Sequence, residues 1–231
     1  NEPNLVDETN GRIDPAGFLP VLRAGSLAVH AADHDALIVF PGLAPNSLMY
    51  DDWAMADDWY LEALLQLNNG EAARYFDVLG VHAYSAGNAP DTYWPGNPAE
   101  TPGWNEAPEF YFRRIERMHT VLVDQGLTDM PVWITEFGWP SGNYATTYGY
   151  GEWITRAMQA DYLVRAFEIM RTELHWVQNA IVWHLNTAAY GSPGHAFTGF
   201  SVTSAEGQPY PAFTAISANA AIWRSDGHQS E

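Results

Sequence analysis

Short apolar runs alternate along this chain with stretches of helical spacing. Four such runs occupy residues 36–40, 76–84, 132–137 and 180–185, and each gives way to glycine, proline or polar residues. Continuous apolar runs of this length are typical of strands that are covered on both faces of a parallel sheet. Their alternation with helices predicts an α/β fold built on a parallel sheet.

The helical stretches are residues 15–32, 51–67, 109–125, 158–174 and 211–222, and residues 1–5 have the character of a further strand end. Long segments rich in aromatic residues follow the strands, at 85–107, 139–153 and 186–208. In a (β/α)8 TIM barrel, the loops after the strands carry the active site. The order of elements and the position of the long loops therefore predict this barrel.

A complete barrel needs eight strand–helix units and about 250 residues. The 231 residues supply about five, which we interpret as strands four to eight. We expect one domain over residues 1–224, the C-terminal portion of a barrel, followed by a polar tail over 225–231. Because the chain starts at Asn1, inside an expected strand end, we also expect the first three units to be missing.

Composition excludes several kinds of partner. Ten basic and 28 acidic residues give a net charge of −18, which repels nucleic acid and anionic membrane surfaces but leaves a neutral sugar unaffected. The chain has no cysteine, so disulfides and thiolate metal sites are impossible. No apolar run approaches the roughly 20 residues of a membrane helix.

Two glutamates occupy unusual positions at expected strand ends. Glu136 follows the apolar run from Val132 and is succeeded by Gly138, so this carboxylate needs partners to be tolerated among apolar neighbours. Glu2 lies between Asn1 and Pro3, where a solvated terminal acid is the alternative interpretation. A pair of carboxylates on facing strand ends is the chemical equipment of a glycosidase.

Four motifs, in this order, resemble clan A of the retaining glycoside hydrolases. They are Asn1-Glu2-Pro3, His82-x-Tyr84, Ile134-Thr135-Glu136-Phe137-Gly138 and Trp183. The first motif alone is weak, but the set is specific and spans nearly the whole chain. The resemblance implies a (β/α)8 fold and hydrolysis of β-linked sugars without a metal or organic cofactor.

The resemblance also implies roles for individual residues. It makes Glu2 the acid/base and Glu136 the nucleophile, and Asn1 looks like the residue that binds the sugar 2-hydroxyl. Tyr84 matches a tyrosine that holds the nucleophile ionised, and His82 matches a histidine that lines the same pocket.

Trp183 resembles the platform beneath the sugar at the cleavage point. The alternatives are structural: a hydrogen-bonded pair in the barrel wall for His82 and Tyr84, and core packing for Trp183.

Aromatic residues crowd the expected loops. The set is Tyr93, Trp94, Trp104, Trp139, Tyr144, Tyr148, Tyr150 and Trp153. Aromatic rings stack on the apolar faces of sugars, so a substrate cleft would explain them, and packing among the loops is the alternative. Trp139, three residues after Glu136, is the residue from which we most expect substrate contact. Polar candidates for sugar hydroxyls are Asp91, Asn97, Asn143 and Asn186.

His30 and His34 have the i, i+4 spacing of helical metal ligands, but no third ligand is evident nearby, so we expect no metal site. The sequence thus predicts a retaining β-glycosidase acting on β-linked oligo- or polysaccharides, with no nucleic acid or membrane partner. Secretion is expected from the substrate class alone.

Two alternatives stay open. One is a non-catalytic carbohydrate-binding relative. The other is an inactive fragment, because the first three strands, which we expect to be missing here, bring an arginine and part of the sugar pocket in such enzymes.

Overall fold

A computed structural model describes residues 1–48, 53–96, 103–142, 146–186 and 196–227 of the chain. It divides into two compact units. Unit 1 comprises Asn1–Ala83, Arg114–Glu136 and His175–Ala180, and unit 2 comprises Tyr84–Arg113, Phe137–Leu174 and Ile181–Glu231. Among the described residues, no helix combines the length and apolar character that a membrane span requires.

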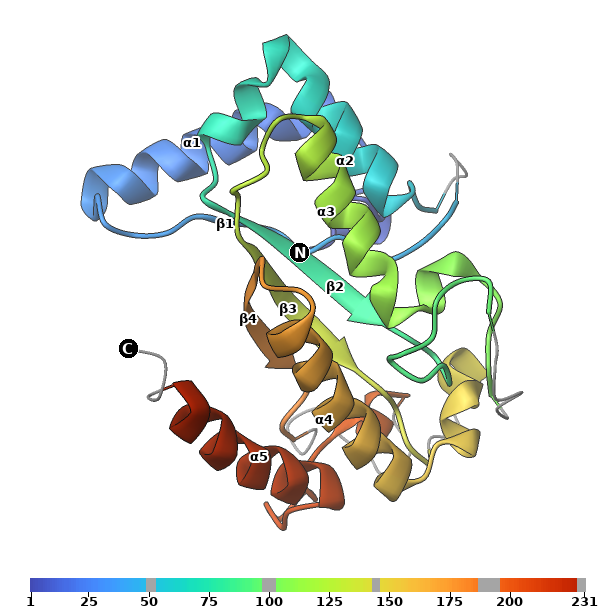
Figure 1. The fold of residues 1–231 in the computed structure, drawn as a ribbon. Coiled ribbons are helices and arrows are strands. Elements are labelled where there is room, and N and C mark those ends of the chain that lie inside the picture. The colour runs from blue at the N-terminus through green and yellow to red at the C-terminus, as the bar shows by residue number, and fades with distance from the viewer. Residues whose placement is uncertain (49–52, 97–102, 143–145, 187–195, 228–231) are drawn as a thin grey trace. The chain divides into compact units, whose positions relative to one another are not determined.

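Four strands pair in sequence order to form one sheet (Figure 1). They are β1 (Val39–Phe40), β2 (Val78–Tyr84), β3 (Val132–Gly138) and β4 (Val177–Val182). β1 and β2 are parallel, with Val39 opposite Val78. The α/β class and the parallel sheet predicted from the alternating pattern are confirmed.

The fifth strand, expected at residues 1–5, is absent from the described sheet. Leu5 forms only an isolated antiparallel bridge with Ala54. Pro3 has no N–H to donate to a ladder, and Glu2 has a left-handed backbone with φ of 38°, which a strand cannot contain. The Glu2 N–H instead donates to the carbonyl of Gly42 at 3.1 Å.

Unit 1 contains helices α1 (Pro15–Ala32), α2 (Asp57–Gln66) and α3 (Ile115–Asp124). α1 begins where the Asp14 side chain accepts a bond from the Gly17 N–H, with proline at the first helical position. α2 packs against both α1 and α3 (Figure 1). Phe40 of β1 is completely buried in this core, in edge contact with Phe18.

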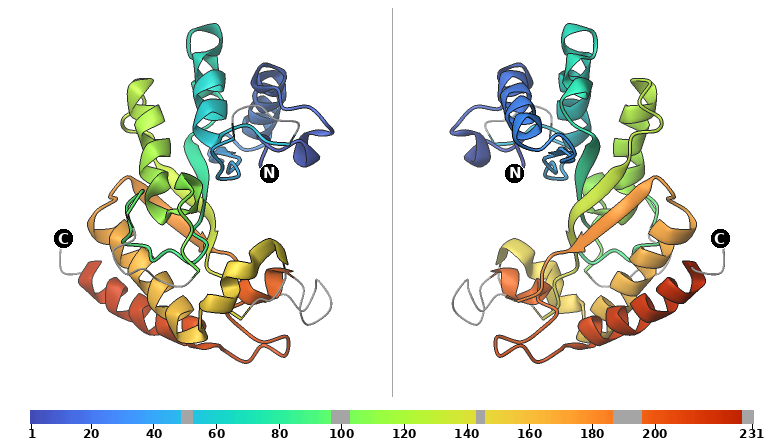
Figure 2. Two further views of the ribbon diagram at one scale, coloured as in Figure 1. Left: turned by 90° about the vertical axis from the view of Figure 1, so that its right-hand side faces the viewer. Right: turned by 90° about the vertical axis from the view of Figure 1, so that its left-hand side faces the viewer.

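Unit 2 contains α4 (Arg156–Thr172) and α5 (Pro211–Gly227), which lie side by side (Figure 2). The Thr155 side chain caps α4 by accepting from the Met158 N–H. Short 3₁₀ helices complete the described chain: η1 (Asp7–Thr9), η2 (Leu67–Asn69), η3 (Glu71–Arg74), η4 (Pro108–Phe110), η5 (Phe112–Arg114), η6 (Thr146–Trp153) and η8 (Ala196–Phe200).

Several boundaries differ from the sequence prediction. α2 begins at Asp57 rather than at residue 51, and α3 begins at Ile115 because two 3₁₀ turns occupy the expected first turns. β4 begins three residues earlier than its apolar run. α5 continues to Gly227, so the expected polar tail starts as helix.

Candidate active site

Three titratable side chains of unit 1 converge. His82 lies on β2 and its side chain is buried, whereas Glu136, near the end of β3, is partly exposed. Glu2 lies in the N-terminal segment and is also partly exposed. Side chains alternate between the two faces of a strand, so the direct neighbours of His82 and of Glu136 lie on the opposite face of their strands.

The imidazole of His82 lies between the two carboxylates. Its Nδ1 atom is 2.8 Å from Oε1 of Glu2, a hydrogen bond, and its Nε2 atom is 3.7 Å from Oε1 of Glu136. One oxygen of each glutamate and one ring nitrogen all lie within 4.8 Å of one another. Retaining glycosidases hold their two carboxyl groups about 5–5.5 Å apart, and inverting enzymes about 6.5–9.5 Å. A closest approach of the two carboxylates within 4.8 Å is compatible with the spacing of a retaining enzyme.

Gly42 packs closely against the His82 ring of this cluster. A Cβ atom on Gly42 would lie 2.6 Å from Oγ1 of Thr135 and closer still to the His82 ring. Its carbonyl accepts the N–H of Glu2. Gly42 therefore sets both the depth of the imidazole and the position of the Glu2 backbone. The sequence pattern indicated only that this glycine ends a strand, because its close approach to His82 is a tertiary contact.

The remaining residues predicted from the resemblance divide between the units. Asn1 belongs to unit 1 and is exposed. Tyr84 and Trp183 belong to unit 2, where their rings meet edge to face at 5.9 Å. Trp183 also contacts Phe197 and Phe200 and is half-buried, so one part of its surface stays open.

The prediction that Trp139 contacts substrate is contradicted by its burial. Its side chain is completely buried, and its indole N–H donates to the Asn88 carbonyl at 2.8 Å. Phe112 and Phe137 pack against the ring. A tryptophan whose only polar atom is satisfied inside the protein and whose faces are covered by aromatic rings belongs to the core of unit 2.

Among the loop aromatics of unit 2 whose side chains are described, Tyr93, Trp94 and Trp153 are more than half exposed. The Trp94 indole N–H donates to the Glu106 carbonyl, and the Arg113 guanidinium lies 4.6 Å from the centre of the Tyr93 ring. These contacts fix the Trp94 and Tyr93 rings, although the guanidinium covers part of one face of Tyr93.

Trp104 is only partly exposed and donates to the Tyr111 hydroxyl. Tyr144, Tyr148 and Tyr150 lie outside the described side chains.

The polar candidates are in part engaged within unit 2. Asp91 accepts three bonds from Arg165, at 2.6, 2.8 and 3.1 Å, and the Asn186 amide donates to the Ser204 carbonyl. Asn97 and Asn143 lie outside the described residues.

The possible metal donors fall into two groups in the described part of the chain: the Glu2–His82–Glu136 cluster and the exposed Asp33–His34–Asp35 run. His30 contacts the Ala36 carbonyl and does not join the second group.

No family model and no curated protein matches this chain. Solved structures do. A family 39 glycoside hydrolase from Bacteroides cellulosilyticus WH2 aligns with 94% of the chain at 18% identity and a TM-score of 0.59. The enzyme of the same family from Xanthomonas axonopodis pv. citri aligns with 96% at 17% identity and a TM-score of 0.61. The chain therefore shares its fold with part of these glycoside hydrolase structures.

The chain spans 39% of the length of each of these two glycoside hydrolase structures. A further match is a family 128 endo-β-1,3-glucanase from Amycolatopsis mediterranei, solved with laminarihexaose. It aligns with 94% of the chain at 17% identity and a TM-score of 0.56, and the alignment covers 69% of the glucanase. The partial (β/α)8 barrel predicted from the sequence is thus confirmed as a fold.

Proposed function

We propose that the protein is a retaining β-glycosidase in which Glu136 is the nucleophile and Glu2 the acid/base. The observation that carries this proposal is the approach of the two carboxylates to within 4.8 Å around His82. The motifs that suggested these roles and the barrel fold agree with it. Neither carboxylate is sealed in the protein, so both can reach a bound sugar.

In the first step, a Glu136 oxygen bonds to the anomeric carbon while the bond from that carbon to the leaving oxygen breaks. Glu2 gives its proton to the leaving oxygen, and a glycosyl ester on Glu136 results. In the second step, Glu2 takes a proton from water as the water oxygen bonds to the anomeric carbon and the ester bond breaks. Both glutamates return to their starting states.

His82 suits the change of state that Glu2 undergoes in this cycle. With the ring proton on Nδ1, this atom donates to the ionised Glu2 carboxylate, and with the ring proton on Nε2, Nδ1 accepts from the protonated carboxyl group. The same 2.8 Å contact is therefore compatible with the acid form and the base form. Glu2 can keep one orientation through both steps.

For the substrate we propose a β-linked oligo- or polysaccharide. The exposed rings of Tyr93, Trp94 and Trp153 are suited to stacking on sugar faces. A neutral glycan also fits a chain with a net charge of −18, which would repel an acidic one. The laminarihexaose complex of the family 128 structure illustrates such a substrate on a related barrel.

Covalent labelling tests the nucleophile directly. The protein and its Glu136→Gln variant are incubated with activated 2-deoxy-2-fluoro β-glycosides of glucose, mannose, xylose and galactose, and their intact masses are measured. We expect the mass of one sugar residue to be added to the parent and nothing to the variant, because glutamine cannot form the ester. Labelling at another residue, confirmed by peptide mapping, would refute the assignment of Glu136.

Turnover of aryl β-glycosides is measured in parallel. Glu136→Gln should lose about 10³-fold or more in kcat. If the parent neither labels nor turns over any glycoside but still binds β-glucan oligosaccharides, the non-catalytic carbohydrate-binding alternative is correct instead.

A further inference from the structure

The segment that carries Glu2 is not part of the sheet. Its backbone contributes the Glu2 bond to Gly42, the Leu5 bond back to the Glu2 carbonyl and the bridge from Leu5 to Ala54. The bridge consists of the bonds from the Val6 N–H to the Trp53 carbonyl and from the Met55 N–H to the Asn4 carbonyl. Pro3 contributes no donor. A catalytic carboxylate must be held within about 0.5 Å of its working position, so something more than these contacts is needed.

Asn4 supplies the missing attachment through its side chain. The residue is completely buried. Its Oδ1 accepts from the Ala44 N–H at 2.9 Å, and its Nδ2 donates to the carbonyls of Ala44 and Met55 at 2.9 and 3.0 Å. Its own backbone carbonyl accepts from the Met55 N–H. The amide thus bonds both polar groups of Ala44, as a neighbouring strand would.

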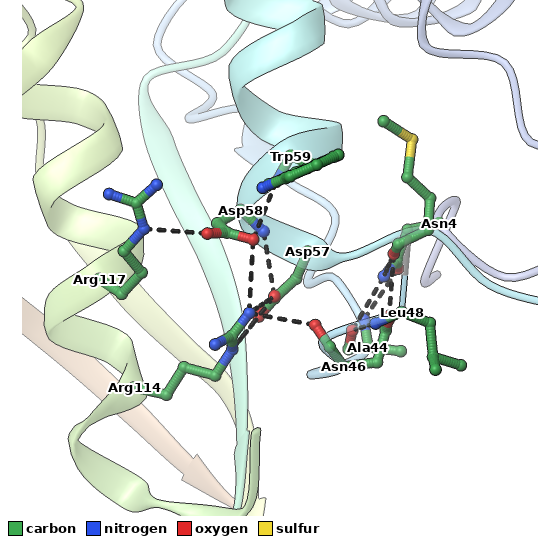
Figure 3. A network of polar contacts seen from close by, with 10 residues as sticks. Asn4, Ala44, Asn46, Leu48, Asp57, Asp58, Trp59, Arg114 and Arg117 are labelled. Carbon is green, nitrogen blue, oxygen red and sulfur yellow. Dashed lines mark hydrogen bonds and ion pairs between the residues drawn. The ribbon is translucent and has the colours of Figure 1, made fainter. Parts of the chain in front are cut away.

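Asn46 donates to the same two carbonyls as Asn4 (Figure 3). Its Nδ2 donates to the carbonyls of Ala44 and Met55, each at 3.0 Å. Each of these carbonyls therefore accepts from two asparagines, which uses both of its lone pairs.

The network then continues into the helices of unit 1. Arg114 donates to the Asn46 carbonyl at 3.0 Å and to the buried carboxylate of Asp57 at the start of α2 (Figure 3). A chain of buried and partly buried polar contacts thus runs from Arg114, directly before α3, to Asn4, two positions after Glu2.

We propose that Asn4 is a positioning residue that fixes the carboxyl group of Glu2 for proton transfer, with Asn46 and Arg114 supporting it. This inference rests on the proposed function of Glu2 as the acid/base. Asparagine is the side chain that fits, because one end must accept and the other must donate two bonds. Aspartate would place an oxygen against two carbonyl oxygens, and alanine would remove all three side-chain hydrogen bonds of this buried position.

Substrates with different leaving groups distinguish a loss of Glu2 positioning from a general loss of activity. Departure of 2,4-dinitrophenolate needs no proton, whereas departure of an unactivated phenol or an alcohol depends on Glu2. For Asn4→Ala we expect kcat/KM to fall about 10²-fold with the poor leaving groups and less than about threefold with the dinitrophenyl glycoside. Equal losses with both would overturn the proposal.

Two further variants keep the test decisive. Leu65→Ala removes a buried side chain of α2 outside the network and should lower stability without changing the leaving-group dependence. Asn46→Ala leaves the bonds of Asn4 in place and should give a smaller loss of the same selective kind. Asn46→Ala can replace Asn4→Ala in this test if Asn4→Ala fails to fold. An equal loss of kcat/KM with both kinds of leaving group in Asn46→Ala would contradict the inference.

A spectroscopic measurement does not depend on turnover. The ¹⁵N shifts of the His82 ring report its hydrogen bond to Glu2 through the tautomer that the bond selects. In the parent we expect one tautomer with Nδ1 engaged, and in folded Asn4→Ala a mixture close to that of free imidazole. An unchanged ring in that variant would refute the positioning role. Failure of the parent to hydrolyse any glycoside would refute the proposed function instead.

Discussion

The Gly42 contact with His82 makes the site sensitive to a single methyl group. In Gly42→Ala the new Cβ would meet the imidazole and Oγ1 of Thr135, so the ring or the strand must move. We expect a destabilisation of about 1–3 kcal/mol and a loss of about 10²-fold in kcat/KM. Chemical denaturation and steady-state kinetics measure the two effects.

Gly25→Ala is the matched control for this substitution. Gly25 lies inside α1 with no atom within 4 Å of the added Cβ. Alanine should there stabilise the helix by up to about 1 kcal/mol and leave activity unchanged. If Gly42→Ala behaved like this control, the close packing of Gly42 against His82 would be disproved.

His119 gives the protein a pH-dependent loss of stability. Its ring stacks on Trp176 at 4.2 Å, and its Nε2 is buried without a hydrogen-bond partner in the described part of the chain. Burial lowers the pKa of His119 below its usual 6.5. The unfolded chain therefore binds the proton more readily, so the stability from the neutral ring is complete above about pH 6.5 and falls as the pH drops toward the folded pKa.

Urea denaturation at pH 7.5 and 5.5 measures this effect. The parent should lose more stability between these values than His119→Phe, which keeps the stacking but cannot titrate. An equal pH dependence in the two proteins would rule out His119 as the cause. Other groups contribute equally to both.

At the scale of elements, an ion-paired network ties α2 to α3 in unit 1. Arg114 bonds the buried carboxylate of Asp57, and the more exposed Arg117 bonds Asp58 at 2.9 Å. Burial raises the pKa of Asp57, and the guanidinium of Arg114 opposes that rise. The carboxylate therefore depends on its partner to remain charged inside the protein.

We expect Arg114→Met to destabilise the protein by about 3–5 kcal/mol, because it leaves a buried carboxylate unpaired. Arg117→Met should cost no more than about 1 kcal/mol, since its pair is partly solvated. The double variant Arg114→Met with Asp57→Leu should recover much of the loss. A double-mutant cycle by denaturation measures the coupling, and additive effects would show that the pair contributes nothing.

The sequence predicts the central strands more accurately than the edge strand β4. β2 and β3 are central strands, and their apolar runs located them to within two residues. β4 is an edge strand, so it tolerates the exposed Gln178 and Asn179, and the apolar run misplaced its start.

The residues of the candidate site also differ in how well the sequence predicts them. His82 and Glu136 lie on the neighbouring strands β2 and β3 and converge, and Glu2 joins them without being in a strand. No sequence pattern predicts the roles of Gly42 and Asn4, because these roles depend on contacts between distant parts of the chain. Trp139 was misassigned because sequence alone does not distinguish a tryptophan in the core from one in a sugar-binding cleft.

At the scale of the whole molecule, each unit presents uncovered apolar side chains. In unit 1, Val21 and Leu27 of α1 are more than half exposed, and in unit 2 Ile181 and Leu185 are at least half exposed. Exposed apolar groups promote association, which the net charge of −18 opposes at low salt.

We therefore expect this 231-residue chain to associate as its concentration and the salt concentration rise. Val21→Lys with Leu27→Glu should weaken the association with a change in stability within about 0.5 kcal/mol. Sedimentation velocity measures the association. A monomer at all concentrations and at 0.5 M salt would contradict this expectation.

The attachment of Glu2 by side-chain amides also bears on how the protein would fail on warming. A segment outside the sheet can detach while the strands and helices stay intact, since local opening needs less free energy than global unfolding. Heat should then abolish proton transfer at a temperature where circular dichroism still reports a folded chain. Cooling would restore it at once, because only a short loop has to return to Ala44 and Met55.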